Sequence, residues 1–340
     1  MTRILLLGAS GYIGGDVLYA LKASLPDCQY TAVLRDQEKA NKISKDYPDV
    51  HILIGDLDDS ALLEEQARQA DVVVHAASTS HIKSVEAISR GLKDPSRPKT
   101  GHWVQISGAS VLSIPDIEKN AFGEGSTHIY SDIDGGDELR HLIKRYEAKR
   151  VVDTFILSLT GETRPLTALI FPPIIYGSGR GPINQRSIQI PELARVTMQR
   201  GKGVQVGKGE STWSNVHISD VSSIFVKLVE KAVQGDMDGR VWNESGLYFP
   251  GIASVRFKTI SERVVEAVKD LGLVESTAVE QISHAEADSL TPHGGVLWGT
   301  NAQQLTQRAR RYLGWVPEGR SLEEEIPFTV LAEAQKLGLK

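Results

Sequence analysis

The sequence predicts an α/β fold in which a doubly wound parallel sheet is followed by a smaller C-terminal lobe. Three observations carry this prediction. Short apolar segments alternate with helical patterns through the first half, each apolar segment is hydrophobic throughout, and a glycine-rich turn follows the first one. Strands without polar alternation are typical of parallel sheets that helices cover on both faces. Right-handed crossovers then wind such a sheet in both directions.

The predicted strands of this sheet follow one another along the chain with helices between them. The strands are expected at 4–8, 30–35, 50–56, 71–77, 102–108 and 165–173. The helices between the first five strands are expected at 12–24, 36–44, 60–69 and 84–93. After residue 108 the alternation loosens, so we expect a loop over 111–135 and one long helix over 136–159.

The second half is predicted to form a lobe that binds the substrate. Residues 174–191 form a segment punctuated by glycine and proline, which is too long for a simple connection and therefore predicts a functional loop. Helices are expected near 191–200, 219–233, 258–271, 300–313 and 321–337. We expect a first domain over 1–175 and a lobe over 176–340, some elements of which return to the first domain.

Composition narrows the class of protein. The chain has 340 residues, 41% of them hydrophobic and 24% charged, which suits a soluble domain with a large core. Its net charge is −5 and it has no block of basic residues, so nucleic acid is not an expected partner. One cysteine, Cys28, excludes an internal disulfide and a cysteine-based zinc site. No other metal-ligand spacing is present.

The apolar runs are too short for a membrane protein. The run Ile4–Leu7 near the N-terminus is shorter than the core of a secretory signal, and no run approaches the ~18 residues of a transmembrane helix. We therefore expect a cytoplasmic protein without a membrane partner.

A glycine-rich turn, "GASGYIG", lies between the first predicted strand and the first predicted helix. Gly8 permits the tight turn, Gly11 lets the backbone approach a pyrophosphate, and Gly14 lets the helix pack on the strand. The helix N-terminus then presents free N–H groups and a partial positive charge to the phosphates. The turn predicts a dinucleotide site of the Rossmann type. The turn residues Ser10, Tyr12 and Ile13 are included in the predicted site.

The end of the second predicted strand, "VLRD", bears on the choice between NAD and NADP. An acidic residue there binds the ribose 2′-hydroxyl of NAD. Arg35 occupies the position directly after the strand, and Lys39 follows one helical turn later. These two cations favour the 2′-phosphate of NADP. NAD remains possible, because Asp36 could bind the hydroxyl.

Two further strand ends complete the predicted cofactor site. "GDLDD" follows the third strand, where Asp56 could accept a hydrogen bond from the adenine amino group and the Leu57 backbone could hold the ring. "HAAS" ends the fourth strand, where Ala76, Ala77 and Ser78 are small enough to let the backbone touch the cofactor.

Several segments together resemble those of a known superfamily. "GASGYIG", "GDLDD", "DVVVHAAS", "WVQISGAS", "PPIIYGSGRGP" and the closing "LGWVP" resemble, in order and spacing, the extended and atypical short-chain dehydrogenase/reductases, also called the NAD-dependent epimerase/dehydratase superfamily. The chain is most similar to an epimerase-like group with a blurred catalytic site. The resemblance implies a nicotinamide cofactor in an N-terminal Rossmann domain, with the backbone of Pro172 and Pro173 beside the nicotinamide.

The resemblance also implies a Tyr-x-x-x-Lys couple and a hydroxyl after the fifth strand, and this chain departs from both. The segment "RYEAKR" offers Tyr146 and Lys149 at a spacing of three, and the expected hydroxyl position is Gly108. Ser107 is the predicted hydroxyl, or else a residue that caps the strand. Tyr146 is either the acid or part of a solvated helix face. The alternative candidates for these two roles are Ser110, Tyr130 and His81.

The resemblance places substrate contacts in the second lobe, and His81, which follows the fourth strand, could reach the nicotinamide side. The predicted contacts are His81, Asn184, Arg186, Gln189, Trp213 and His217. Trp213 and His217 could equally belong to the core of the lobe.

Three functions fit these observations. The first is an NADP(H)-dependent oxidoreductase that acts on a small carbonyl-like substrate. The second is a nucleotide-sugar epimerase or dehydratase. The third is a non-catalytic regulator that senses NADP(H). A homodimer through the predicted helices near 85–92 and 136–159 would follow the superfamily.

Overall fold

A parallel sheet organises the first half of the molecule. The computed structural model describes residues 1–159 and 164–340. Over these residues seven strands form the sheet in the order β11-β7-β5-β4-β1-β2-β3. The strands are β1 (Arg3–Leu7), β2 (Gln29–Leu34), β3 (His51–Ile54), β4 (Val72–His75), β5 (His102–Ile106), β7 (Leu166–Ile170) and β11 (Leu247–Tyr248). The order reverses between β1 and β4, which is where doubly wound sheets bind their ligands.

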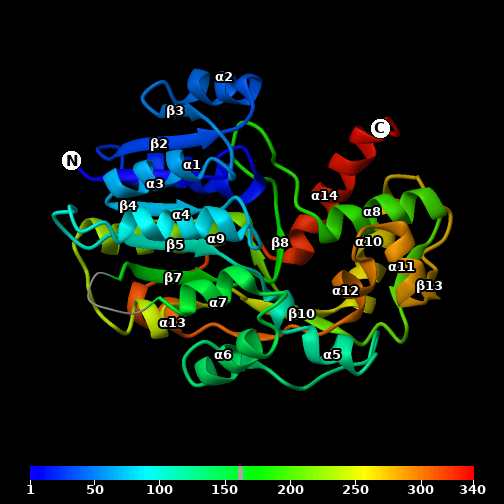
Figure 1. Ribbon diagram of the computed structural model, residues 1–340. Helices are drawn as coiled ribbons and strands as arrows, with labels where there is room; N and C mark the ends of the chain where they lie inside the picture. The colour runs from blue at the N-terminus through cyan, green and yellow to red at the C-terminus, as the bar shows by residue number, and fades with distance from the viewer. Residues whose placement is uncertain (160–163) are drawn as a thin grey trace.

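Helices cover both faces of this sheet (Figure 1). The helices of the first half are α1 (Tyr12–Ser24), α2 (Gln37–Asp46), α3 (Ser60–Gln69), α4 (Ile82–Leu92), α5 (Ile114–Glu118), α6 (Gly136–Arg145) and α7 (Val151–Leu157). Along β1, Ile4 and Leu6 pack into one hydrophobic cluster, while Leu5 and Leu7 pack into the other. Both faces of the strand are therefore buried, which explains its unbroken apolar sequence.

The later helices divide between the sheet and a second group. They are α8 (Gln189–Arg200), α9 (Ile218–Val233), α10 (Phe257–Asp270), α11 (His284–Leu290), α12 (Gly294–Gly299), α13 (Arg308–Leu313) and α14 (Leu322–Lys336). Helix α9 packs beside α1 on the sheet. Helices α8, α10, α11 and α12 gather at the right of Figure 1, away from most of the sheet.

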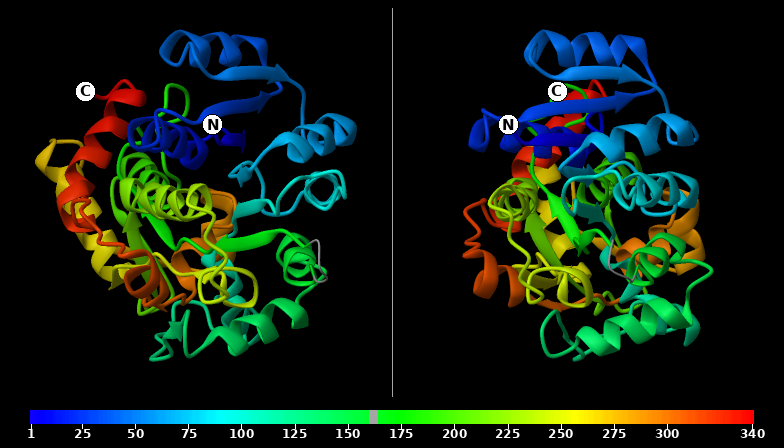
Figure 2. Two further views of the ribbon diagram at one scale, coloured as in Figure 1. Left: turned by 90° about the vertical axis from the view of Figure 1, so that its left-hand side faces the viewer. Right: turned by 60° about the vertical axis from the view of Figure 1, so that its left-hand side comes forward.

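Over the described residues, three short sheets lie outside the main sheet. Strand β8 (Ile174–Tyr176) pairs with β10 (Thr212–His217), which pairs with β12 (Ala253–Arg256). Strand β9 (Gly203–Val206) pairs with β13 (Val279–Ile282) within the second half alone, and β6 (Tyr130–Ser131) pairs with β14 (Gln304–Leu305). In both views of Figure 2, α2 and α6 lie at opposite ends of the molecule. The division near residue 175 stays a prediction, and β11 and α9 are later elements that join the first sheet or its cover.

The structure confirms the doubly wound parallel sheet and corrects three local predictions. The helix expected over 136–159 is two helices, α6 and α7, separated at 146–150. The helix expected over 300–313 is strand β14 followed by the short α13. The loop expected over 111–135 contains α5 and β6. No helix among the described residues has the length and apolar composition that crossing a membrane requires.

Candidate functional site

The turn between β1 and α1 brings the chain close to the end of β4. Gly8 has a φ of +97°, and a Cβ there would lie 2.7 Å from the carbonyl carbon of Ala76. A Cβ on Gly14 would lie 2.1 Å from the carbonyl oxygen of Gly8. Both positions therefore require glycine. Gly11 is the N-cap of α1 and no side chain caps this helix, which leaves first-turn N–H groups for an anion.

A cavity of about 370 Å³ opens in front of this turn, at the carboxyl ends of β1, β2 and β4. It brings together nine of the residues that the sequence singled out. They are Gly8, Ser10, Gly11, Arg35, Asp56, Leu57, Ala76, Ala77 and His81. A hollow of about 690 Å³ at the opposite edge, beside Arg3 and Gln29, lies at the amino ends of the strands. Parallel sheets bind ligands at the carboxyl edge, so the smaller cavity is the candidate site.

The charged residues Arg35, Asp36 and Lys39 follow β2, and they are placed differently relative to this cavity. The exposed Arg35 lines it and forms no ion pair with any described residue. Asp36 instead caps α2, because its Oδ1 accepts a hydrogen bond of 2.9 Å from the Lys39 N–H. This backbone hydrogen bond holds the pKa of Asp36 below its usual value. Lys39 does not line the cavity, although it lies on the first turn of the same helix.

A second cavity, of about 670 Å³, adjoins the first and shares Ala76 with it. The sequence-predicted residues that line it are Tyr12, Ile13, Pro173, Asn184, Arg186 and Gln189. The lining residues that sequence reasoning missed are Ile175, Ser187, Ile188, Glu192, Thr291, Pro292, His293 and Leu297. The stretch from Thr291 to Leu297 contains "TPHGG", a proline- and glycine-bearing turn that could have marked a second functional loop.

Comparison with known proteins agrees with this geometry. Residues 8–128 match a family model described as NAD(P)H-binding. The dTDP-glucose 4,6-dehydratase DesIV of Streptomyces venezuelae, solved with NAD, shares the fold at a TM-score of 0.63 and 16% identity over 98% of this chain and 97% of that one. The UDP-glucose 4-epimerase of Thermotoga maritima, solved with UDP-glucose, has a TM-score of 0.60 and 14% identity over 99% and 100%.

Similarity to a curated relative extends over nearly the whole chain. Oxidase ucsJ of Acremonium sp. is 35% identical over 345 residues, which cover 99% of each protein. The chain belongs to the NAD(P)-binding extended short-chain dehydrogenase/reductase superfamily. The nicotinamide-binding Rossmann fold that the sequence predicted is thus confirmed, whereas the choice between NAD and NADP is not decided by these likenesses.

The superfamily's Tyr/Lys helix is interrupted in this chain. Tyr146 ends α6, and α7 begins only after Arg150. The Tyr146 ring lies 5.4 Å from the Arg145 guanidinium, and the Glu118 carboxylate raises the pKa of the Tyr146 hydroxyl. A catalytic tyrosine needs the opposite shift. Neither Tyr146 nor the exposed Lys149 lines the two cavities, so the structure does not bring this pair to the site.

The break in the helix has a physical cause at Arg150. Its guanidinium is buried, with Nε 2.7 Å from the Asp153 carboxylate and a terminal nitrogen 2.7 Å from the Ser107 hydroxyl. Ser107 in turn donates to Asp153 over 3.1 Å. Burial raises the pKa of Asp153, against the lowering effect of Arg150. Ser107 is therefore held inside an ion-pair network, and Ser110 contacts the same guanidinium over 3.4 Å.

Four other predicted residues have structural roles. The His81 Nδ1 accepts from the Ser84 N–H at the start of α4, and the His217 Nδ1 accepts from the Ser219 N–H at the start of α9. Trp213 is buried and its indole N–H donates to Thr300. Tyr130 is buried in β6, which raises its pKa to about 12.

The remaining predicted residues support the cavity walls. The Ser78 hydroxyl accepts from the His81 N–H over 3.1 Å, which shapes the loop after β4. The Pro172 carbonyl accepts from the Ala109 N–H over 3.0 Å, and this contact joins the ends of β5 and β7 beside Pro173.

The buried His75, behind the cofactor cavity, should make the folded protein less stable in acid. Its ring is fully buried, its Nδ1 accepts from the Ala77 N–H, and burial lowers its pKa from 6.5 to about 3. Below pH 6.5 the His75 ring binds a proton in the unfolded chain but not in the folded chain. The free energy of unfolding therefore decreases as the pH falls from 6.5 toward 3. Between pH 7 and pH 5 this linkage costs about 2 kcal/mol.

Urea unfolding at pH 7 and pH 5 would check this expectation. His75→Gln should remove about 2 kcal/mol of the wild-type pH dependence. The exposed His51→Gln serves as the control and should keep that dependence. An unchanged pH dependence in His75→Gln would show that other groups cause the acid sensitivity.

Proposed function

We propose that this chain is an NADP(H)-dependent oxidoreductase that acts on a small carbonyl-like substrate. The observation that carries the proposal is the pair of adjoining cavities at the carboxyl edge of the sheet. The glycine turn borders the first cavity, and the second continues past Ala76 to the end of β7. Gly11 would hold the phosphates of a dinucleotide bound along this edge, and Pro173 would flank its nicotinamide.

The residues of the turn fit such a cofactor. The close packing at Gly8 and Gly14 holds the turn, and the uncapped start of α1 offers N–H donors to a pyrophosphate. The nicotinamide, when bound, would supply or accept a hydride. When a carbonyl carbon takes the hydride, its oxygen must take a proton. Ser187, Thr291 and His293 line the second cavity and carry exchangeable protons.

The relatives support an oxidoreductase, and the superfamily also contains epimerases and dehydratases. The relative that is 35% identical is named an oxidase, which supports redox chemistry on the substrate rather than a sensor role. A regulator that only senses NADP(H) would have no need for the part of the second cavity that extends from Pro173 to Ile188 and Leu297. The epimerase alternative is supported only by similarity of fold, since the UDP-glucose 4-epimerase is 14% identical to this chain.

Turnover of NADPH with a panel of neutral aldehydes and ketones tests the proposal. We expect at least one compound to oxidise NADPH faster than the background without substrate. Tyr146→Phe should turn over that compound as the wild type does, because its hydroxyl lies outside both cavities. Loss of turnover in Tyr146→Phe at unchanged cofactor affinity would identify Tyr146 as the acid. A panel without any activity would favour the regulator.

The preference for NADP is tested at Arg35. Arg35→Ala should weaken NADPH binding about ten- to a hundredfold, because charge-assisted hydrogen bonds to a phosphate contribute about 1.5–3 kcal/mol. NADH affinity should not change, since NADH has no 2′-phosphate. Lys45→Ala on helix α2, which begins two residues after Arg35, is the matched control, because Lys45 is exposed and does not line the cavity. Equal affinities of the wild type for NADPH and NADH would contradict the assignment.

A further inference from the structure

We propose that the second cavity selects a neutral, predominantly apolar carbonyl compound and rejects substrates that carry phosphates. This inference rests on the proposed function, because it names the substrate class of the same site. It separates the chain from enzymes that act on nucleoside diphosphate sugars. Two independent features carry it, the apolar wall of the cavity and the pairing of its arginine.

The apolar wall includes a side chain that the folded protein leaves uncovered. Ile13, Pro173, Ile175 and Leu297 line the cavity from three segments, namely α1, the chain at the start of β8, and α12. Ile188 joins them at the rim, and 62% of it is exposed. An apolar ligand that covers this exposed isoleucine removes apolar surface from water, which favours binding. A sugar or a phosphate offers no such contact.

The arginine of the cavity is already neutralised by carboxylates. Arg186 holds Glu333 through two hydrogen bonds, of 2.6 Å from Nε and 3.0 Å from a terminal nitrogen. The same terminal nitrogen lies 2.7 Å from Glu192, which also lines the cavity. Glu333 is 4% exposed. Drawing Arg186 toward a phosphate would leave a buried carboxylate unpaired, which is strongly unfavourable.

The remaining charges of the cavity do not attract a diphosphate. Among the described residues that line it, Arg186 is the one lysine or arginine. Glu192 is bound on its other side by Arg195, through contacts of 2.9 and 2.7 Å, so the cluster of Arg186, Arg195, Glu192 and Glu333 is balanced in charge. A diphosphate entering the cavity would meet the Glu192 carboxylate without a free cation to offset it. Neutral polar groups, such as Asn184 and Ser187, are left to orient an uncharged carbonyl compound.

Binding of two probes tests the assignment without any turnover. The probes are prodan, a neutral fluorescent naphthyl ketone, and UDP-glucose, each titrated into the protein with and without NADP⁺. We expect prodan to bind with a saturable shift of its emission to the blue, and UDP-glucose neither to bind in calorimetry nor to displace prodan. NADP⁺ cannot reduce a ketone, so this titration measures binding alone. A protein that binds prodan but turns over no compound of the NADPH panel would overturn the proposed function and support this assignment.

Two variants test the apolar wall and the paired arginine separately. Ile188→Asp should weaken prodan binding about tenfold, because it puts a charge into the apolar wall. Aspartate is favoured at the N-cap position that Ile188 occupies, so the fold should tolerate it. Ile129→Asp is the control, since Ile129 is 54% exposed and does not line either cavity. Glu333→Gln should make UDP-glucose binding detectable in calorimetry, because Arg186 then keeps only the Glu192 carboxylate as an anionic partner.

Three results would overturn the assignment. The first is saturable UDP-glucose binding to the wild type that displaces prodan. The second is prodan binding that Ile188→Asp and Ile129→Asp affect equally. The third is a folded Glu333→Gln variant, with the wild-type circular dichroism, to which calorimetry still detects no binding of UDP-glucose.

Discussion

Gly11→Val is expected to lower the affinity for NADPH about a hundredfold or more while the protein still folds. Gly11 lines the cofactor cavity at the N-cap of α1, with a φ of −84° and a ψ of 170° that valine can adopt. A Cβ there would be 3.3 Å from the Gly8 carbonyl oxygen, a close contact that a small shift relieves. The branched side chain would occupy the space in which the pyrophosphate meets the backbone N–H groups.

Gly11 is the informative position because the other two glycines are needed for the fold itself. At Gly14 a Cβ would overlap the Gly8 carbonyl, and at Gly8 it would overlap the end of β4. Gly239→Val is a suitable control, because a Cβ at Gly239 meets no atom of the described residues beyond its chain neighbours within 4 Å. Calorimetric titration with NADPH measures the affinity, and circular dichroism checks the fold. A folded Gly11→Val that binds NADPH like the wild type would place the phosphates elsewhere.

The sequence predicted the first half well because its signals are local. The strand and helix over 4–24 lie within one residue of β1 and α1, since a buried strand, a glycine turn and an amphipathic helix follow one another without a gap. The cofactor cavity is built from the ends of such strands. Gly8, Arg35, Asp56 and Ala76, which line it, could therefore be recognised from the amino-acid sequence alone.

The predictions failed where distant residues decide the local structure. The helix over 136–159 breaks where Arg150 turns inward to Ser107, which is 43 positions away in the chain. The helix over 300–313 gives way to β14, because Gln304 pairs with Tyr130 and its side chain donates to the Phe171 carbonyl. The apolar cavity needs Thr291–Leu297 to meet the loop before α8. Periodicity within a segment carries no information about such partners.

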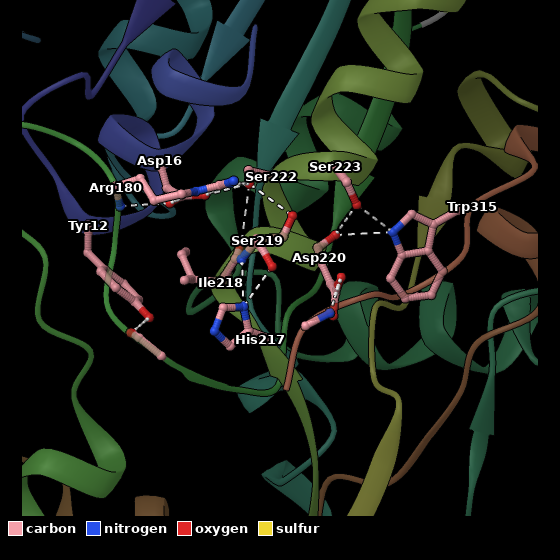
Figure 3. A network of polar contacts seen from close by, with 12 residues as sticks. Tyr12, Asp16, Arg180, His217, Ile218, Ser219, Asp220, Ser222, Ser223 and Trp315 are labelled. Atoms are coloured by element: carbon pink, nitrogen blue, oxygen red, sulfur yellow. Dashed lines mark hydrogen bonds and ion pairs between the residues drawn. The ribbon is translucent and has the colours of Figure 1, made fainter. Parts of the chain in front are cut away.

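A buried ion pair fastens the predicted functional loop to the cofactor helix (Figure 3). Asp16 on α1 is fully buried, and Arg180 in the loop between β8 and α8 holds it through Nε at 2.9 Å and a terminal nitrogen at 2.6 Å. The Ser222 hydroxyl on α9 donates to the same carboxylate. Nearby, the Tyr12 hydroxyl donates to the Gly177 carbonyl over 2.7 Å. This network ties the loop with Asn184 and Arg186 to the helix that begins at the phosphate turn.

Arg180→Met should therefore lower the free energy of unfolding by about 3 kcal/mol, because it leaves the Asp16 charge buried without its cation. The Arg180 N–H and Ser222 still donate to Asp16, so the loss lies at the lower end for a broken buried pair. Arg240→Met is the matched control. It breaks the pair with Asp238, in which the Arg240 side chain is 69% exposed, and should cost about 1 kcal/mol or less.

A double-mutant cycle separates the buried charge from the packing of the arginine. Asp16→Asn removes the charge while its amide oxygen can still accept from the Arg180 N–H. In that background Arg180→Met should cost about 1 kcal/mol or less, which gives a coupling of about 2 kcal/mol between the two residues in urea unfolding. A coupling near zero would mean that Arg180 stabilises the loop by its contact with the Tyr19 ring, 4.6 Å away, rather than by its charge. The loop would then be held by stacking on α1, and Asp16 would be stabilised by its two neutral donors alone.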